Sequence, residues 1–179
     1  MMQILIAMAD ICELDIDDPR WNDIEIEKLA ETAFASVLKH HKLGADWQIG
    51  VLACSDDRIA ELNDTYRDKN KATNVLSWPN FDLSPANAGE IPPPTGFDDS
   101  LGDIAISYDT CVQEAQLGGI AVQSHLTHLL IHSCLHLLGY DHETDADAQR
   151  MENLETELLA KLGIDDPYKN GADGGVHFG

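Results

Sequence analysis

Apolar residues recur along the chain in two patterns, one typical of buried strands and the other of amphipathic helices. Short apolar runs predict four strands, at residues 3–8, 47–53, 74–78 and 103–107. Spacings of three and four predict five helices, at residues 24–40, 56–67, 109–116, 122–138 and 145–162. Ser55 stands where it can cap the second helix, with Ile59, Leu62 and Tyr66 on the inner face. The resulting order predicts an α+β fold in which helices cover a small, mixed, four-stranded sheet.

Two segments between and after these elements have the composition of irregular structure. Residues 79–100 are rich in proline, glycine and acidic residues, which predicts a long surface loop. Residues 166–179 contain many glycines and few apolar residues, so we expect a disordered tail. Neither a repeat nor a change of composition divides the remainder. We therefore expect a single domain over residues 1–165.

The chain is strongly acidic, with 32 Asp and Glu against 11 Lys and Arg and a net charge of −21. This charge disfavours non-specific binding to membranes or nucleic acids, and so disfavours a protein that merely coats nucleic acid. It does not exclude an enzyme that acts on a phosphodiester, because a few charges at the site act more strongly than remote, screened ones.

Cysteine usage and the absence of apolar spans point to a cytoplasmic protein. The four cysteines are scattered without a C-x-x-C pair, which indicates reduced, mostly buried thiols. The sequence MMQILIAMAD has no basic residue before its apolar core and no small-residue cleavage site, so it is a poor signal peptide. The longest apolar stretch elsewhere, residues 126–138, is too short to span a membrane.

The segment HSCLHLLGYDH, residues 132–142, has the spacing of a metal site. His132 and His136 are four residues apart, so on a helix both side chains point to the same side. Gly139 lets the chain reverse after the helix and bring His142 back towards the same ion. Three imidazoles and an open fourth position are typical of catalytic zinc. We therefore expect one Zn²⁺ per chain, while nickel, copper and iron also accept such ligands.

Two other interpretations of the three histidines stay open. They could be unrelated residues on a helix and in a loop, although three of them around one glycine would be a coincidence. The spacing H-x-x-x-H-x-x-G-x-x-H also occurs in metzincin peptidases, which place a glutamate directly after the first histidine as general base. Here that position is Ser133, which disfavours a peptidase.

The histidine segment resembles the signature of the YbeY family of bacterial endoribonucleases. Residues 62–79, LNDTYRDKNKATNVLSWP, and residues 101–107, LGDIAIS, resemble two further blocks of that family. The resemblance covers roughly residues 50–160 and implies a metal-dependent, single-strand-directed endoribonuclease of rRNA maturation and ribosome quality control. Ser133 and Trp78 depart from the glycine and phenylalanine expected at their positions.

The resemblance also implies roles for individual residues. The zinc ligands of the family fall on His132, His136 and His142, and its functionally important arginine falls on Arg67. Zinc would activate a water and polarise a phosphate oxygen, so that attack needs less help from a separate base. Arg67 would bind the phosphate and stabilise the charge that develops on it.

Several neighbouring residues have two interpretations each. Arg67 could instead form a surface ion pair with Asp64 or Glu61. Lys69 and Lys71 could guide RNA or simply be solvated. His128, one turn before His132, could be a further ligand, a substrate contact, a partner of a ligand, or a structural residue. Asp141 could orient a ligand imidazole or cap the bend, and Cys134 should point away into the core.

The expected partners are rRNA precursors, with ribosomal proteins or a ribosome-associated GTPase as hypothetical partners that deliver the substrate, and no membrane. Two other functions stay open. One is a zinc peptidase or another zinc hydrolase, and the other is a non-catalytic ribosome-associated factor that binds metal.

Overall fold

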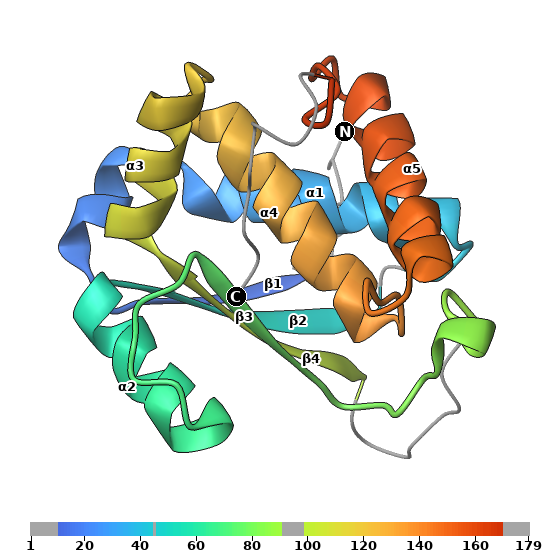
Figure 1. Ribbon diagram of the computed structural model, residues 1–179, viewed down its shortest axis with the longest axis horizontal. Coiled ribbons are helices and arrows are strands. Elements are labelled where there is room, and N and C mark those ends of the chain that lie inside the picture. The colour runs from blue at the N-terminus through green and yellow to red at the C-terminus, as the bar shows by residue number, and fades with distance from the viewer. Residues whose placement is uncertain (1–10, 45, 91–98, 170–179) are drawn as a thin grey trace, which may run out of the picture.

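A single sheet with helices on both faces forms the protein (Figure 1). The computed structural model describes residues 11–44, 46–90 and 99–169. In this part of the chain the strands are β1 (Cys12–Ile16), β2 (Gln48–Cys54), β3 (Val75–Pro79) and β4 (Ser100–Ser107). The helices are α1 (Ile26–His40), α2 (Asp56–Arg67), α3 (Tyr108–Gly118), α4 (Val122–Leu137) and α5 (Asp145–Lys161). Helices α1, α3, α4 and α5 lie on one side of the sheet, and α2 lies on the other.

The sheet is mixed and has the strand order β1-β2-β4-β3. Strands β1 and β4 pair with β2 in parallel, and Val51 of β2 lies opposite both Leu14 and Ile104. Strand β3 runs antiparallel to β4, with Val75 opposite Ile106, and forms one edge of the sheet. The α+β fold with a mixed four-stranded sheet is therefore confirmed.

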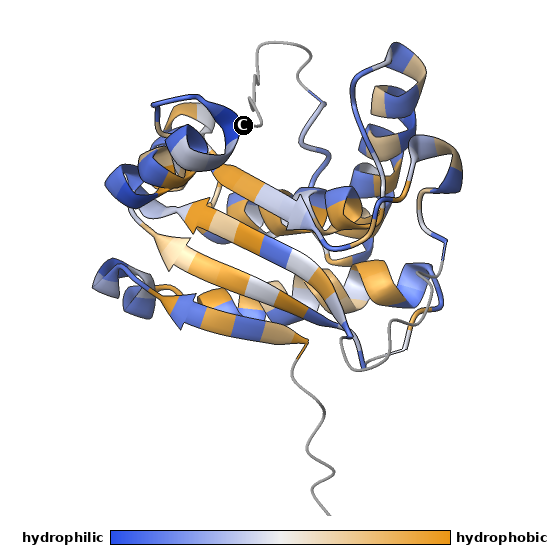
Figure 2. Cartoon of the chain, turned by 90° about the horizontal axis from the view of Figure 1, so that it is seen from below, coloured by the Kyte–Doolittle hydropathy of each residue, from blue (hydrophilic) through white to orange (hydrophobic). Residues whose placement is uncertain are grey.

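The N-terminal strand differs from the sequence prediction. The strand expected at residues 3–8 lies outside the described residues, and the first described strand is Cys12–Ile16 instead. Its sequence CELDI alternates, because Glu13 and Asp15 stay exposed while the cysteine is buried. Figure 2 shows such alternation of hydrophobic and hydrophilic positions on the strands, seen from the side of α2. Because β1 is an edge strand of the sheet, Glu13 and Asp15 can stay in contact with solvent.

The remaining elements fall close to their predicted positions. Helix α2 has the predicted bounds, and the Ser55 side chain accepts a hydrogen bond from the backbone N–H of Arg58, as expected of a cap. Strand β4 begins at Ser100 rather than at residue 103. One detail is wrong: Tyr66, expected on the inner face of α2, is 65% exposed. Its ring instead lies edge-on to Trp78 of β3.

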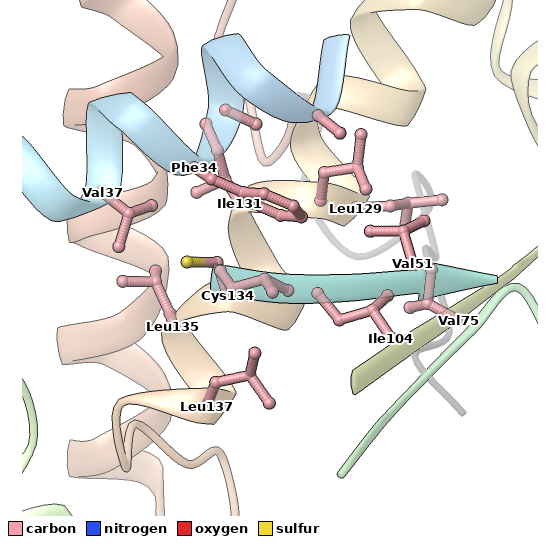
Figure 3. Packing of buried hydrophobic residues seen from close by; sticks show 14 of the residues in the cluster. Phe34, Val37, Val51, Val75, Ile104, Leu129, Ile131, Cys134, Leu135 and Leu137 are labelled. Atoms are coloured by element: carbon pink, nitrogen blue, oxygen red, sulfur yellow. The ribbon is translucent and has the colours of Figure 1, made fainter. Parts of the chain in front are cut away.

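The hydrophobic core lies between the sheet and helices α1 and α4. Phe34 and Val37 of α1 meet Ile131 and Leu135 of α4 above Val51 of the sheet (Figure 3). Each such buried side chain contributes roughly 1.5–3 kcal/mol of transfer free energy. The four cysteines are buried and free, as expected, and Cys134 belongs to this core. Helix α4 is enclosed on most of its surface, so its histidines enter a buried environment.

The part of the expected tail that the structure describes is ordered. Residues 166–169 form a turn that packs on α5, whereas residues 170–179 of the expected tail lie outside the described residues. In the expected loop, Pro85–Asn87 form a short 3-10 helix, and residues 91–98 are outside the description. No helix in the described ranges is long and apolar enough to cross a membrane.

Candidate metal centre

Gly139 reverses the chain at the end of α4. Its φ of 94° is in the left-handed region, and a Cβ at this position would lie 2.7 Å from Cβ of Leu83 and 2.8 Å from its carbonyl oxygen. Both the backbone angle and the close approach therefore require glycine. After the reversal, the backbone N–H of Tyr140 donates to the carbonyl of Leu135 at 3.1 Å. The turn thus returns residues 140–142 towards the last turn of the helix.

This reversal brings the three predicted histidines together. One ring nitrogen of each of His132, His136 and His142 lies within 4.8 Å of the others. The Nε2 atoms of His132 and His136 are 3.0 Å apart. The ring of His142 is centred 5.0 Å from that of His136 and 5.7 Å from that of His132. The group is the size of a site for a single ion.

The hydrogen bonds of the two helical histidines decide which nitrogen is available to a metal. Nδ1 of His132 is 2.5 Å from Oε1 of Glu155, and Nδ1 of His136 is 2.8 Å from the carbonyl oxygen of Tyr140. A carboxylate and a carbonyl only accept, so each Nδ1 carries a proton and donates it. Each Nε2 therefore keeps a lone pair, and the two lone pairs converge.

Convergent lone pairs 3.0 Å apart repel each other, so a cation between them is favourable. Two nitrogens bound to one tetrahedral zinc at 2.0–2.1 Å lie about 3.3 Å apart, close to this separation. The donor set of His132, His136 and His142 therefore fits zinc.

Burial keeps the helical imidazoles neutral, which is the form that binds metal. Desolvation lowers the pKa of His132, and Glu155 opposes this shift in part. Desolvation, together with the neighbouring His132 and His142, lowers the pKa of His136 to about 3. Because His142 is exposed while His132 is buried, the group opens to solvent on the side of His142.

A cleft of about 370 Å³ runs along this open side. Its walls include His136 and His142, Leu83 and Pro85 of the segment opposite, and Arg67 and Ser77 from α2 and β3. Arg67 is the last residue of α2, and its Nη2 donates to the carbonyl oxygen of Ser77 at 3.2 Å. Edge strand β3 thus holds the guanidinium at the cleft. Glu61, one of the two partners considered for a surface ion pair, binds Arg58 instead.

The other sequence candidates lie outside the group of three histidines. Lys69 and Lys71 are exposed in the loop that follows α2. Nε2 of His128 is 3.2 Å from the hydroxyl of Tyr168. Asp141 accepts hydrogen bonds from the backbone N–H groups of His142 and the following residue, so it caps the bend.

Glu155 of α5 is the contact of the site that sequence reasoning missed. It is fully buried and binds His132, the most buried histidine of the group. A signal for it exists, since Glu155 lies within the apolar pattern of Met151, Leu154 and Leu158 on α5. A carboxylate at a buried helical position needs a partner, and this could have drawn attention to it.

Comparisons with known proteins identify relatives of this chain. The model of the family described as "Endoribonuclease YbeY" matches residues 14–163. A protein of that name from Ruegeria sp. (strain TM1040) is 50% identical over 163 residues, which cover 88% of this chain and 96% of the relative. One from Cereibacter sphaeroides is 44% identical over 167 residues, covering 90% of this chain and 100% of the relative.

A solved structure shares the fold. The solution structure of TM1509 from Thermotoga maritima superposes with a TM-score of 0.53 at 21% identity, covering 85% of this chain and 91% of that one. This likeness concerns the fold alone. Because the family model spans most of the chain and a relative of that name is half identical over nearly its whole length, this chain belongs to the Endoribonuclease YbeY family.

Proposed function

We propose that this protein is a zinc-dependent endoribonuclease that hydrolyses phosphodiester bonds of single-stranded RNA. The observation that carries the proposal is the pair of convergent Nε2 lone pairs of His132 and His136, beside a cleft that also holds Arg67. The names of the family relatives support the reaction class. In this proposal His132, His136 and His142 bind one Zn²⁺, and these three with Arg67 form the catalytic site.

Each residue of the site has its own role in the proposed chemistry. Zinc, when bound, lowers the pKa of a bound water towards about 7 and polarises a phosphate oxygen. Glu155 and the carbonyl of Tyr140 hold the two helical imidazoles with Nε2 towards the ion. Arg67 offers a permanently charged, planar donor to the phosphate and stabilises the negative charge that grows on it during attack.

Two observations favour RNA over a peptide substrate. Ser133 is buried and occupies the position where a metzincin peptidase has its general base, so the peptidase interpretation lacks its main catalytic group. The cleft of about 370 Å³ has room for one nucleotide of a single strand, and Arg67 in its wall offers a fixed positive charge that suits a phosphodiester better than a neutral peptide bond.

The cellular role follows from the family and from the charge. We propose that the substrates are rRNA precursors and that the protein acts in the cytoplasm in rRNA maturation and ribosome quality control. With a net charge of −21, the surface as a whole repels RNA. Delivery of the substrate by a ribosomal protein or a ribosome-associated GTPase would overcome this repulsion.

Arg67→Ala separates an enzyme from a metal-binding factor without catalysis. We expect cleavage of single-stranded RNA to fall by about 100- to 1,000-fold, as on removal of one donor to a developing negative charge. The zinc content should stay at the wild-type value, because Arg67 is not one of the three proposed ligands and its Nη2 donates to the carbonyl oxygen of Ser77.

Arg58→Ala is the matched control, since Arg58 lies on the same helix but binds Glu61. It should cleave RNA at the wild-type rate. Equal cleavage by Arg67→Ala and wild type would contradict the assigned role. If neither the wild type nor Arg67→Ala cleaves RNA although both bind zinc, the non-catalytic ribosome-associated factor is favoured.

A further inference from the structure

A buried carboxylate connects the histidine group to the C-terminal part of the described chain. Glu155 is 0% exposed, and each of its two oxygens has its own donor. Oε1 faces Nδ1 of His132 at 2.5 Å, and Oε2 accepts from the hydroxyl of Tyr168 at 2.5 Å. His128 closes the network, because its Nε2 is 3.2 Å from the Tyr168 hydroxyl and 3.7 Å from Oε2.

Burying a charged carboxylate is costly unless its oxygens are hydrogen-bonded. Here the two partners compensate that cost, and the carboxylate in turn fixes both of them. Since a carboxylate accepts only, His132 must carry its proton on Nδ1 and leave Nε2 for a metal. Glu155 therefore determines both the tautomer and the ring orientation of His132.

Tyr168 is held in place by a turn that forms its own contacts. Oδ1 of Asp166 accepts from the backbone N–H of Tyr168 at 2.8 Å and from the hydroxyl of Thr156, next to Glu155 on α5, at 3.3 Å. The Tyr168 ring also lies edge-on to His128, with centroids 5.5 Å apart. The turn at residues 166–169 thus anchors the phenol hydroxyl against the second oxygen of Glu155.

We infer that Glu155 and Tyr168 are positioning residues of the metal centre, with Tyr168 acting through Glu155 on His132. The C-terminal turn is then part of the site, although none of its residues lines the cleft. This inference rests on the proposed function in that His132 is taken as a metal ligand. It adds a tyrosine and a carboxylate that do not line the cleft.

The test compares Glu155→Gln, Tyr168→Phe and the double variant in zinc affinity, measured by competition with a chelator in the absence of RNA. Glu155→Gln should weaken zinc binding by about 10- to 100-fold, the usual effect of losing such a partner. Tyr168→Phe should weaken it less. The double variant should be no weaker than Glu155→Gln alone, because Tyr168 acts through the carboxylate.

A spectroscopic readout and a control variant distinguish positioning of His132 by Glu155 and Tyr168 from a purely structural role. In ¹⁵N-detected NMR of the metal-free protein, His132 should be protonated on Nδ1 in the wild type and should shift in both single variants. Tyr108→Phe is the matched control, since its ring packs on Trp21 instead, and it should change neither readout. Circular dichroism establishes that each variant is folded.

Folded Tyr168→Phe and Glu155→Gln variants with wild-type zinc affinity and an unchanged His132 signal would overturn the inference. A wild-type protein that binds zinc without cleaving RNA contradicts the proposed function but leaves this comparison intact. A wild-type protein that binds no zinc would overturn both.

Discussion

At the scale of single residues, the site depends on contacts that restrict each histidine to one arrangement. His132 is fixed by Glu155 and His136 by the carbonyl of Tyr140, so the two proposed helical ligands are already oriented in the metal-free protein. His142 depends on the turn at Gly139 instead. Replacing Gly139 by alanine adds a single methyl group, yet it should displace His142 and so disturb the geometry of the histidine group.

Gly139→Ala should lower the free energy of unfolding by about 1–3 kcal/mol from backbone strain alone, and further from the contact with Leu83. It should also weaken zinc binding, because His142 follows the turn. Urea unfolding and chelator competition measure the two effects. Gly119→Ala is the control, as Gly119 has a φ of 64° but nothing within 4 Å of an added Cβ. If Gly139→Ala and Gly119→Ala lose equal amounts of unfolding free energy, the contact with Leu83 is unimportant.

At the scale of elements, the helices could be predicted from the sequence more completely than the strands. The three-and-four spacing on α1, α2 and α5 is strong because each helix has one buried face. Strand β1 was missed because Glu13 and Asp15 interrupt its apolar residues. A short edge strand that is half exposed carries a weak signal.

The histidine group shows the same division between local and long-range information. The spacing of His132, His136 and His142 is local, so the sequence was sufficient to expect that they meet. Glu155 lies 23 residues from His132, and its contact depends on how α5 packs against α4. Such a pairing between helices cannot be derived from periodicity alone.

A prediction at this scale concerns the start of α2. Ser55→Ala should lower the free energy of unfolding by about 1 kcal/mol, because it removes the acceptor for the backbone N–H of Arg58. Thermal unfolding measures the change, and zinc content should be unaffected. Ser84→Ala is the comparison, since Ser84 precedes a 3-10 helix without forming a side-chain cap. A loss as large for Ser84→Ala would argue against a specific capping effect.

At the scale of the whole molecule, partly desolvated, neutral histidines make the stability of the metal-free protein depend on pH. The pKa of His136 falls from 6.5 to about 3, and that of His41 falls to about 4, chiefly through desolvation. The folded state therefore disfavours protonation. Below pH 6.5 the unfolded chain binds protons that the folded chain does not, so stability is lost as the pH falls from 6.5 towards the folded values.

The melting temperature of the metal-free protein should therefore fall between pH 7 and pH 5. High, constant salt is needed, because the repulsion among acidic residues also changes with pH. His41→Gln should reduce the slope, since one of the imidazoles whose pKa is lowered in the folded state is then absent. A melting temperature that is constant or rises on acidification would show that these histidines do not control the stability.

The most direct measurement is elemental analysis of the purified protein and of His136→Ala, each followed by an assay on single-stranded RNA. We predict about one zinc per chain and RNA cleavage in the wild type, with both lost in the folded variant. The reason is that His136 supplies one of the two convergent Nε2 atoms. Wild-type protein without metal, or a variant that keeps both zinc and cleavage, would contradict the central claim.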